Sequence, residues 1–219
     1  MTEPTQSAFT YRVPEWCKGA TVKVNGESMA CGEPGRFATI RRMFCDEDVI
    51  ELDFPLETVF EVLPPRHYVI MDFVNKWAGK IEGRGGSQGT VVRRGPLLFA
   101  YPVPANKTED SIDCGPDFKS WNLRPAGAFN YALAAHESKT EFSAQSPESG
   151  FCDGTANVAV AVPVKRIEWE LEKGRFTPDI PEKIKILNDT IEWLTLVPYG
   201  STTLRLTVFP DVAHAEMPN

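Results

Sequence analysis

The chain has 219 residues and a mass of 24.4 kDa, which suits one large all-β domain or two small domains. A net charge of -7 and a pI near 5.1 argue against the basic surface with which proteins bind nucleic acids or anionic membranes. The 18 prolines and 16 glycines interrupt the apolar runs, which favours many short strands over long helices.

Targeting and metal-binding signals are missing from the sequence. The first seven residues are polar and acidic, unlike a signal peptide, and no apolar run is long enough to span a bilayer. The five cysteines include no C-x-x-C pair, so neither a zinc site nor a disulfide framework is indicated. We therefore expect free thiols, no metal or other cofactor, and a cytoplasmic location.

Strand signals begin close to the N-terminus. Apolar and polar side chains alternate over residues 9–13 and 21–24, and Asn25-Gly26 is a strong signal for a two-residue hairpin turn. Three more short strands are expected, over residues 37–40, 49–54 and 59–62. The pattern predicts a meander with one buried face and one solvated face.

The pattern then loosens over residues 64–89, which contain two adjacent prolines and several glycines. We expect a long irregular connection here. Its glycine-rich part, residues 83–89, precedes no helix, so a flexible loop is favoured over a phosphate-binding loop.

Strands are expected again at residues 90–93 and 97–101, followed by a polar, breaker-rich connection over residues 104–120. Later strand signals are short, β-branched or aromatic, and lie at residues 128–133, 157–162, 167–171, 191–197 and 203–209. The sequence thus predicts an all-β fold of two β-sandwich (jelly-roll-like) lobes, residues 1–103 and 104–219.

No local motif indicates catalysis. A nucleophile elbow is absent, and His67, His136 and His214 lie in unrelated contexts, where each is interpreted as a solvated loop residue. Glu168 and Glu170 share one face of an expected strand and are interpreted as an exposed acidic pair, not as opposed glycosidase carboxylates. We therefore predict no catalytic residue.

Aromatic side chains are the remaining indication of a binding role. Trp169 and Trp193 lie within strand patterns and are expected in the core. Trp77 and Trp121 lie in polar segments, where an exposed ring could stack on the C–H face of a sugar. These two tryptophans are the candidate carbohydrate-binding residues.

Longer strings carry a family resemblance. Residues 11–26 (YRVPEWCKGATVKVNG) and 48–55 (DVIELDFP) resemble the segments L-R-I-P-x-W…V-x-V-N-G and G-D-V-I-E-L-D-L-P of β-L-arabinofuranosidase-like glycoside hydrolases, the family 127 type. Residues 94–99, 129–133 and 196–205 are similar to R-G-P-L-V-F/Y, W-N-Y-A-L and L-I-P-Y-G-C-T-x-L-R of the same family, in the same order.

The resemblance implies a longer enzyme in which catalysis and the β-sandwich region belong to different domains. Members of the family carry an (α/α)₆ barrel with an acid/base Glu and a zinc-bound Cys nucleophile, followed by β-sandwich domains. This chain resembles the β-sandwich region alone, and none of its cysteines or glutamates falls on a matching catalytic motif. No catalytic or metal residue is therefore carried over, and residues 190–210 are expected to return to the first lobe.

These observations lead to three functional hypotheses. The first is a non-catalytic accessory region of a bacterial-type glycoside hydrolase acting on (arabino)furanosidic plant glycans, with an α/α barrel as its partner in cis or in trans. The second is an independent carbohydrate-binding module with an oligosaccharide ligand. The third is a cryptic glycosidase with its site between the lobes.

The resemblance also implies that the chain begins late. The family has further strands before the one at residue 9, whereas eight polar or small residues precede Phe9 here. We expect the chain to be the back end of something larger, with an unpaired sheet edge that allows a homodimer.

Overall fold

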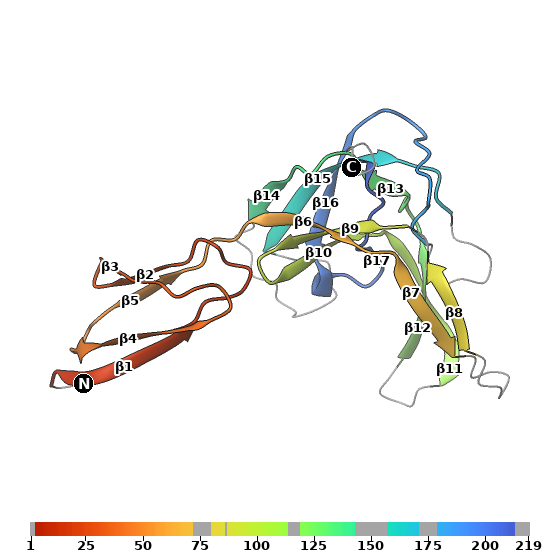
Figure 1. Ribbon diagram of the computed structural model, residues 1–219. Coiled ribbons are helices and arrows are strands. Elements are labelled where there is room, and N and C mark those ends of the chain that lie inside the picture. The colour runs from red at the N-terminus through yellow and green to blue at the C-terminus, as the bar shows by residue number, and fades with distance from the viewer. Residues whose placement is uncertain are drawn as a thin grey trace. The chain divides into compact units, whose positions relative to one another are not determined.

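The structure of the protein is a computed structural model, and its strands fall into two compact units (Figure 1). The described residues are 3–71, 80–85, 87–113, 119–142, 157–170 and 179–212.

The chain passes between the two units more than once. The first unit comprises Met1–Thr58 with the turn Arg94–Pro96, and the second comprises Val59–Arg93 with Leu97–Asn219. The lobes expected from the sequence, 1–103 and 104–219, remain a prediction about domain organisation. Each unit has its own hydrophobic core and is described separately below.

The first unit contains a two-stranded antiparallel sheet, β1–β4, and a three-stranded sheet in the order β3-β2-β5. Its strands are β1 (Thr5–Arg12), β2 (Thr21–Val24), β3 (Glu27–Met29), β4 (Phe37–Phe44) and β5 (Ile50–Asp53). Alternation along β2 buries Val22 and Val24 while Thr21 and Lys23 remain exposed. Six buried residues form the core of this unit: Tyr11, Val13, Val22, Val24, Ile40 and Phe44.

The β2–β3 hairpin turns at Asn25 and Gly26, as the sequence predicts. Their φ angles are 52° and 81°, the left-handed region that a two-residue hairpin turn requires. The Asn25 side chain donates to Asp48 Oδ1 at 2.7 Å and accepts from the Val49 N–H at 2.9 Å. Hydrogen bonds from Asn25 and from the Cys45 N–H lower the pKa of the Asp48 carboxyl. The turn residue thus also ties the hairpin to the start of β5.

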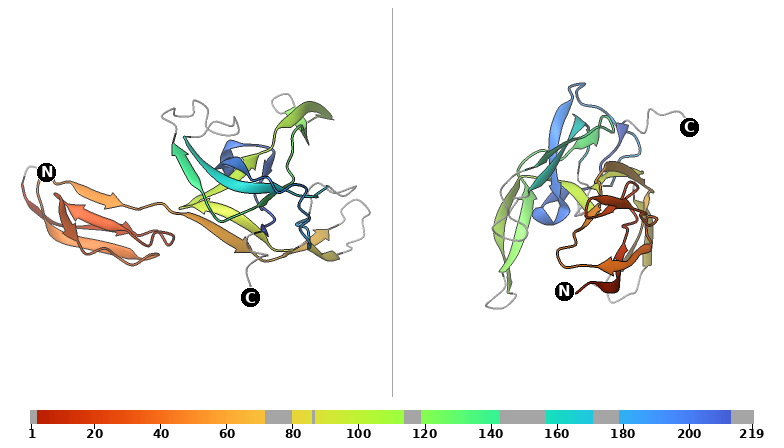
Figure 2. Two further views of the ribbon diagram at one scale, coloured as in Figure 1. Left: turned by 90° about the horizontal axis from the view of Figure 1, so that it is seen from above. Right: turned by 90° about the vertical axis from the view of Figure 1, so that its left-hand side faces the viewer.

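The second unit is built on an eight-stranded sheet in the order β13-β15-β16-β10-β9-β6, with β14 on β15 and β17 on β10 (Figures 1 and 2). Its strands are β6 (Thr58–Leu63), β9 (Gly89–Arg94), β10 (Leu97–Pro102), β13 (Tyr131–Leu133), β14 (Lys139–Phe142), β15 (Val158–Arg166), β16 (Glu192–Pro198) and β17 (Arg205–Leu206).

Strand β15 lies at the centre of the second core. Its alternate residues Val160 and Val162 are fully buried, and they lie opposite Leu196 and Leu194 of β16. Cross-strand aliphatic pairs of this kind are the main source of sheet stability. Val164 continues the same buried row.

Strand β10 joins distant parts of the chain in this sheet. Phe99 and Ala100 pair with Pro198 and Val197 of β16, and Tyr101 pairs with Leu206 of β17. Residues 192–206 therefore lie in the same sheet as residues 97–102. Phe99 is fully buried at this junction.

Two segments expected to be irregular form hairpins instead. Residues 64–89 contain β7 (Arg66–Met71) and β8 (Lys80–Gly85), which pair antiparallel. Residues 104–120 contain β11 (Ala105–Asp113) and the start of β12 (Lys119–Pro125), which pair antiparallel. The prediction failed because backbone hydrogen bonds, not alternating apolar residues, define these ribbons. The residues of β11, ANKTEDSID, show no apolar alternation that would predict a strand.

The predicted all-β, sandwich-like fold class is confirmed. Apart from the 3₁₀ turn η1 (Tyr199–Ser201), the described elements are all strands. Within the described residues, no helix has the length and apolarity that a membrane crossing requires.

We expect Gly89→Ala to destabilise the second unit. A Cβ atom there would lie 2.4 Å from Val208 Cγ1 and 3.3 Å from the Phe209 carbonyl oxygen. Because the neighbouring Thr90 and Phe209 are joined through their backbones, the strands cannot separate freely. The free energy of unfolding should fall by about 1–3 kcal/mol, measured by urea denaturation.

Gly26→Asn is the matched control. A Cβ atom at Gly26 meets no atom within 4 Å, and Asn tolerates a positive φ. Its unfolding midpoint should stay near that of the wild type. A wild-type midpoint for Gly89→Ala would contradict the close packing around Gly89.

Candidate functional site

Of the two candidate sugar-binding tryptophans, the structure describes only Trp121. Trp77 lies outside the described residues. Trp121 lies on β12 opposite Glu109 of β11, on a strand and not in a loop as expected. It is 43% exposed, and Lys107 Nζ lies 4.0 Å from the centre of its ring.

One face of the β11–β12 hairpin carries these groups together. Lys107 pairs with Leu123 and Glu109 pairs with Trp121, so all four side chains share one face. Lys119 Nζ lies 3.1 Å from Glu109 Oε2. The result is an exposed aromatic ring beside two ammonium groups and a carboxylate. Such a surface can stack on a sugar ring and hydrogen-bond to its hydroxyls.

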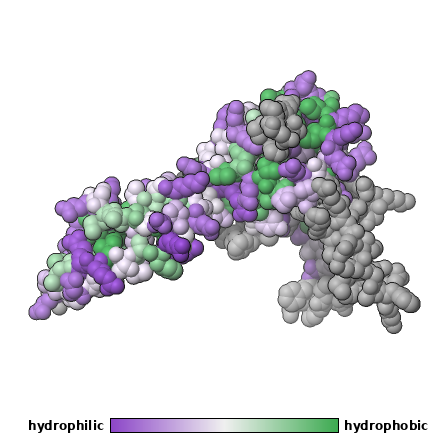
Figure 3. All heavy atoms as spheres, in the orientation of Figure 1, coloured by the Kyte–Doolittle hydropathy of each residue, from purple (hydrophilic) through white to green (hydrophobic). Residues whose placement is uncertain are grey.

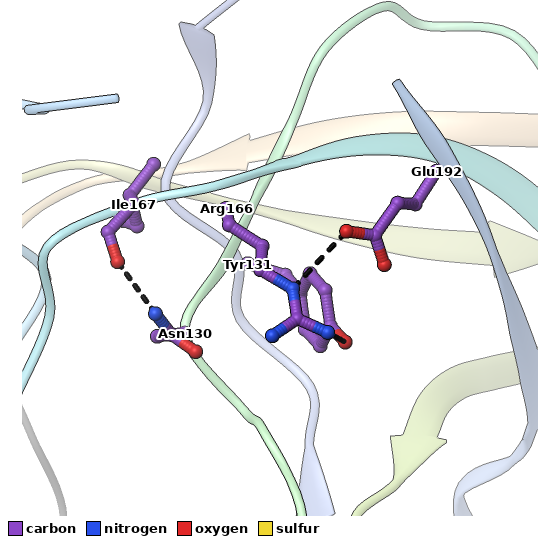
Figure 4. Close-up of polar contacts among 5 residues, drawn as sticks. All are labelled: Asn130, Tyr131, Arg166, Ile167 and Glu192. Atoms are coloured by element: carbon purple, nitrogen blue, oxygen red, sulfur yellow. Dashed lines mark hydrogen bonds and ion pairs between the residues drawn. The ribbon is translucent and has the colours of Figure 1, made fainter. Parts of the chain in front are cut away.

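A second polar cluster lies on the eight-stranded sheet, where β13, β15 and β16 are neighbours (Figure 4). Arg166 Nε donates to Glu192 Oε1 at 3.1 Å, and its Nη2 donates to the Tyr131 hydroxyl at 3.2 Å. Asn130 Nδ2 donates to the Ile167 carbonyl at 2.7 Å. These bonds connect the segment containing Asn130 and Tyr131 to β15 and β16.

The electrostatics of this cluster follow from its neighbours. The hydrogen bond that Arg166 donates to Glu192 raises the pKa of Arg166, because the carboxylate stabilises the charged guanidinium. Burial raises the pKa of Tyr101, whose ring lies edge-on to Tyr131 with centroids 5.6 Å apart. The side chains of Arg166 and Glu192 are 41% and 36% exposed, so water screens the pair. We interpret the cluster as a junction between strands.

His136 lies outside the strands and is exposed, as the sequence suggests, but it also has specific partners. Its Nε2 lies 2.7 Å from Asp211 Oδ2, and its ring stacks on Phe60 with centroids 4.9 Å apart. The same Asp211 oxygen accepts a hydrogen bond of 2.5 Å from the buried Thr90 hydroxyl. The sequence did not reveal these partners because they are far apart along the chain. His214 and the side chain of His67 lie outside the described part of the chain.

The Thr90–Asp211–His136 arrangement differs from a nucleophile–base pair. The Thr90 hydroxyl donates to the carboxylate, whereas an activated hydroxyl must give its proton to the imidazole. The Thr90 and Phe209 backbones exchange hydrogen bonds of 2.8 and 2.9 Å. This group of residues therefore anchors the segment around residue 209 to β9.

Two hollows adjoin this region of the second unit. One, of about 500 Å³, has a mixed lining: its apolar residues include Ile180, Ile184 and Ile186, and its polar residues include Thr90 and Asp211. The other, of about 460 Å³, has a mainly acidic lining of Glu168, Trp169, Glu170, Asp179, Ile180, Pro181 and Glu182. Within the described residues, no group of three His, Cys, Asp or Glu side chains could hold a metal ion.

The exposure of the residues in the second hollow agrees with the sequence-based interpretation, but residues 167–170, the described part of the strand expected over residues 167–171, do not form a strand, because β15 ends at Arg166. Glu168 and Glu170 are exposed, and Trp169 between them is buried. The Trp169 indole donates to the Asp179 carbonyl at 2.7 Å.

Trp193 corrects a sequence-based expectation. Predicted as core, it is 44% exposed, with Lys139 Nζ 3.8 Å from its ring centre. Leu194 and Leu196 occupy the buried face of β16, so period-two alternation places Trp193 on the opposite face. The same alternation was visible in the sequence and could have shown this.

The comparisons with known proteins bear first on the N-terminal unit. The family model described as "Beta-L-arabinofuranosidase, GH127 middle domain" matches residues 1–56. Residues 1–56 are therefore similar to the middle domain of that family. The resemblance found in the sequence is thereby confirmed. No curated protein matches the chain.

Solved structures resemble the chain over most of its length. A protein titled "Glycoside hydrolase" has a TM-score of 0.55 at 16% identity, covering 94% of this chain and 28% of that one, which shows the fold alone. The GH127 beta-L-arabinofuranosidase from Geobacillus stearothermophilus T6 has a TM-score of 0.46 at 20% identity, covering 94% of this chain and 27% of that one. The chain thus spans less than a third of either protein.

We expect Thr90→Val to weaken the anchor in the second unit. The change keeps the side-chain shape but removes a buried donor to Asp211, so the free energy of unfolding should fall by about 1–3 kcal/mol in urea denaturation. Thr10→Val is the control, because the Thr10–Thr39 hydroxyl contact is exposed. Equal unfolding midpoints for the two variants would contradict an anchoring role for Thr90.

Proposed function

We propose that this chain is the non-catalytic accessory region of a GH127-type glycoside hydrolase acting on (arabino)furanosidic plant glycans. The observation that carries the proposal is the match of residues 1–56 to a middle domain of that family. The all-β architecture supports the proposal. The hydrogen bonds of Thr90 and His136 to Asp211 support it too, because they stabilise the fold and do not activate a nucleophile.

The proposed partner is an α/α-barrel catalytic domain, bound in cis or in trans. The chain covers 28% of a solved glycoside hydrolase of similar fold, which leaves most of that protein without a counterpart here. Several large hydrophobic side chains are exposed on the two units, among them Phe37 and Phe142 at 72% each. Exposed apolar side chains of this size are available for contacts with another domain.

The pure chain should not hydrolyse an aryl arabinofuranoside, whereas adding it to a separately produced GH127 catalytic barrel should raise the melting temperature of the barrel. The chain would bind the folded barrel and so stabilise it by mass action. The readouts are aryl release and thermal unfolding, with serum albumin as the protein control. Turnover by the pure chain, or an unchanged barrel melting temperature at saturating chain, would contradict the proposal.

A second candidate function is oligosaccharide binding by the β11–β12 hairpin. The observation that favours it is the exposed Trp121 ring flanked by Lys107, Glu109 and Lys119. Lys107 covers one side of the ring, so a sugar would stack on the other side or displace the ammonium group. This function is compatible with an accessory role.

Trp121→Ala should abolish binding of arabinose-containing oligosaccharides, measured by isothermal titration calorimetry. The loss is expected because the ring supplies the apolar contact area for the sugar. Trp193→Ala is the matched control, because Trp193 is equally exposed and also lies beneath a lysine ammonium. No heat with the wild-type chain, or an equal loss in both variants, would contradict a sugar site at Trp121.

A further inference from the structure

Strand β1 has one edge that no described strand covers. It pairs along its whole length with β4, from Thr5↔Phe44 to Arg12↔Phe37, and the β1–β4 sheet has only these two strands among the described residues. The row of backbone groups on the other edge of β1 is therefore available for pairing with another strand.

The hydrogen-bond pattern identifies the residues that face this edge. The Val13 N–H donates to Arg36 and the Val13 carbonyl accepts from Gly35, so both backbone groups of Val13 point towards the β4 side. Because backbone direction alternates, the odd residues of β1 bond to β4 and the even ones direct their N–H and C=O outwards. The outward-facing set is Gln6, Ala8, Thr10 and Arg12. The Thr10–Thr39 side-chain contact of 2.9 Å agrees, since non-hydrogen-bonded pairs bring side chains closer.

The composition of β1 does not protect this edge. Its sequence, TQSAFTYR, has no proline or glycine, one terminal charge and no register shift against β4. Natural edge strands usually carry central charges, prolines or bulges that block pairing. The other edge of this sheet has such protection, because β4 carries Arg41 and Arg42 near its centre. Self-pairing of β4 would bring four guanidinium groups into one short ladder.

We propose that a second copy of this chain pairs antiparallel with β1 through its outer edge. The even-numbered residues of one copy must lie opposite even-numbered residues of the other. In the register that pairs all four outward-facing residues, Gln6 lies opposite Arg12 and Ala8 lies opposite Thr10 of the other copy. Neither pair opposes like charges. The two Phe9 residues then meet at the two-fold axis as a non-hydrogen-bonded pair.

Phe9 suits this central position. It is 36% exposed on the face of β1 that also holds the buried Tyr11, and the two rings are stacked with centroids 6.1 Å apart. Pairing would extend this aromatic row across the axis, and cross-strand aromatic pairs stabilise sheets. Hydrophobic and hydrophilic residues are interspersed over the visible face of the first unit (Figure 3). This pairing of β1 strands does not depend on the proposed accessory role in a glycoside hydrolase.

The test is sedimentation velocity of the full chain over a wide concentration range. We expect the wild-type mass to rise from 24.4 kDa towards twice that value. Ala8→Pro removes an outward N–H without breaking a bond to β4, so it should remain monomeric with an unchanged circular dichroism spectrum. Arg41→Pro is the matched control on the opposite edge of the same sheet and should dimerise as the wild type does.

Three outcomes would overturn the proposal. They are a wild-type chain that is monomeric at every concentration, an Ala8→Pro variant that is folded and still dimeric, and dimerisation that is lost with Arg41→Pro instead. A monomeric wild type would leave the β1 edge for a strand of some other polypeptide.

Oxidative cross-linking tests the register. Phe9→Cys should form an interchain disulfide, because a non-hydrogen-bonded pair places two Cα atoms within disulfide range. Ser7→Cys, on the same face, opposes Tyr11 of the other copy and should not cross-link. Cross-linking through residue 7 and not residue 9 would contradict the register.

Discussion

The architecture of the larger unit depends on backbone pairing of β10 with β16 and β17. Phe99 and Ala100 of β10 lie opposite residues nearly a hundred positions later in the chain. Closing so long a loop costs conformational entropy, which burial of Phe99 and Leu196 helps to offset. Once β10 and β16 are paired, β9 and β15 have sites on either side, and the remaining strands of the sheet follow.

Side-chain hydrogen bonds then hold the segments that the sheets alone leave free. Asn25 ties a hairpin turn to the start of β5, and Asn130 binds the Ile167 carbonyl beyond the end of β15. Thr90 and His136 both bond to one buried oxygen of Asp211. Each bond joins residues far apart in the sequence. These polar side chains therefore stabilise the fold by joining distant segments.

The candidate site was only partly predictable from the sequence. Trp121 was identified because an aromatic residue in a polar segment tends to be exposed, and the structure shows it 43% exposed. Lys107 and Glu109, which flank it, were not identified, since their place depends on the register of β11 against β12. Trp193 was misplaced because hydrophobicity was weighed above alternation, although Leu194 and Leu196 already defined the buried face of that strand.

The sequence by itself determined the all-β class, most central strands, the Asn25-Gly26 turn and the family resemblance of residues 1–56. These features are local, because alternation, turn chemistry and motif order can be read from neighbouring residues. Only the tertiary structure decided the β7–β8 and β11–β12 hairpins, the partners of His136 and the uncovered edge of β1. Those depend on which distant backbone groups find each other, and a hydrogen bond between main-chain atoms leaves no mark on residue identity.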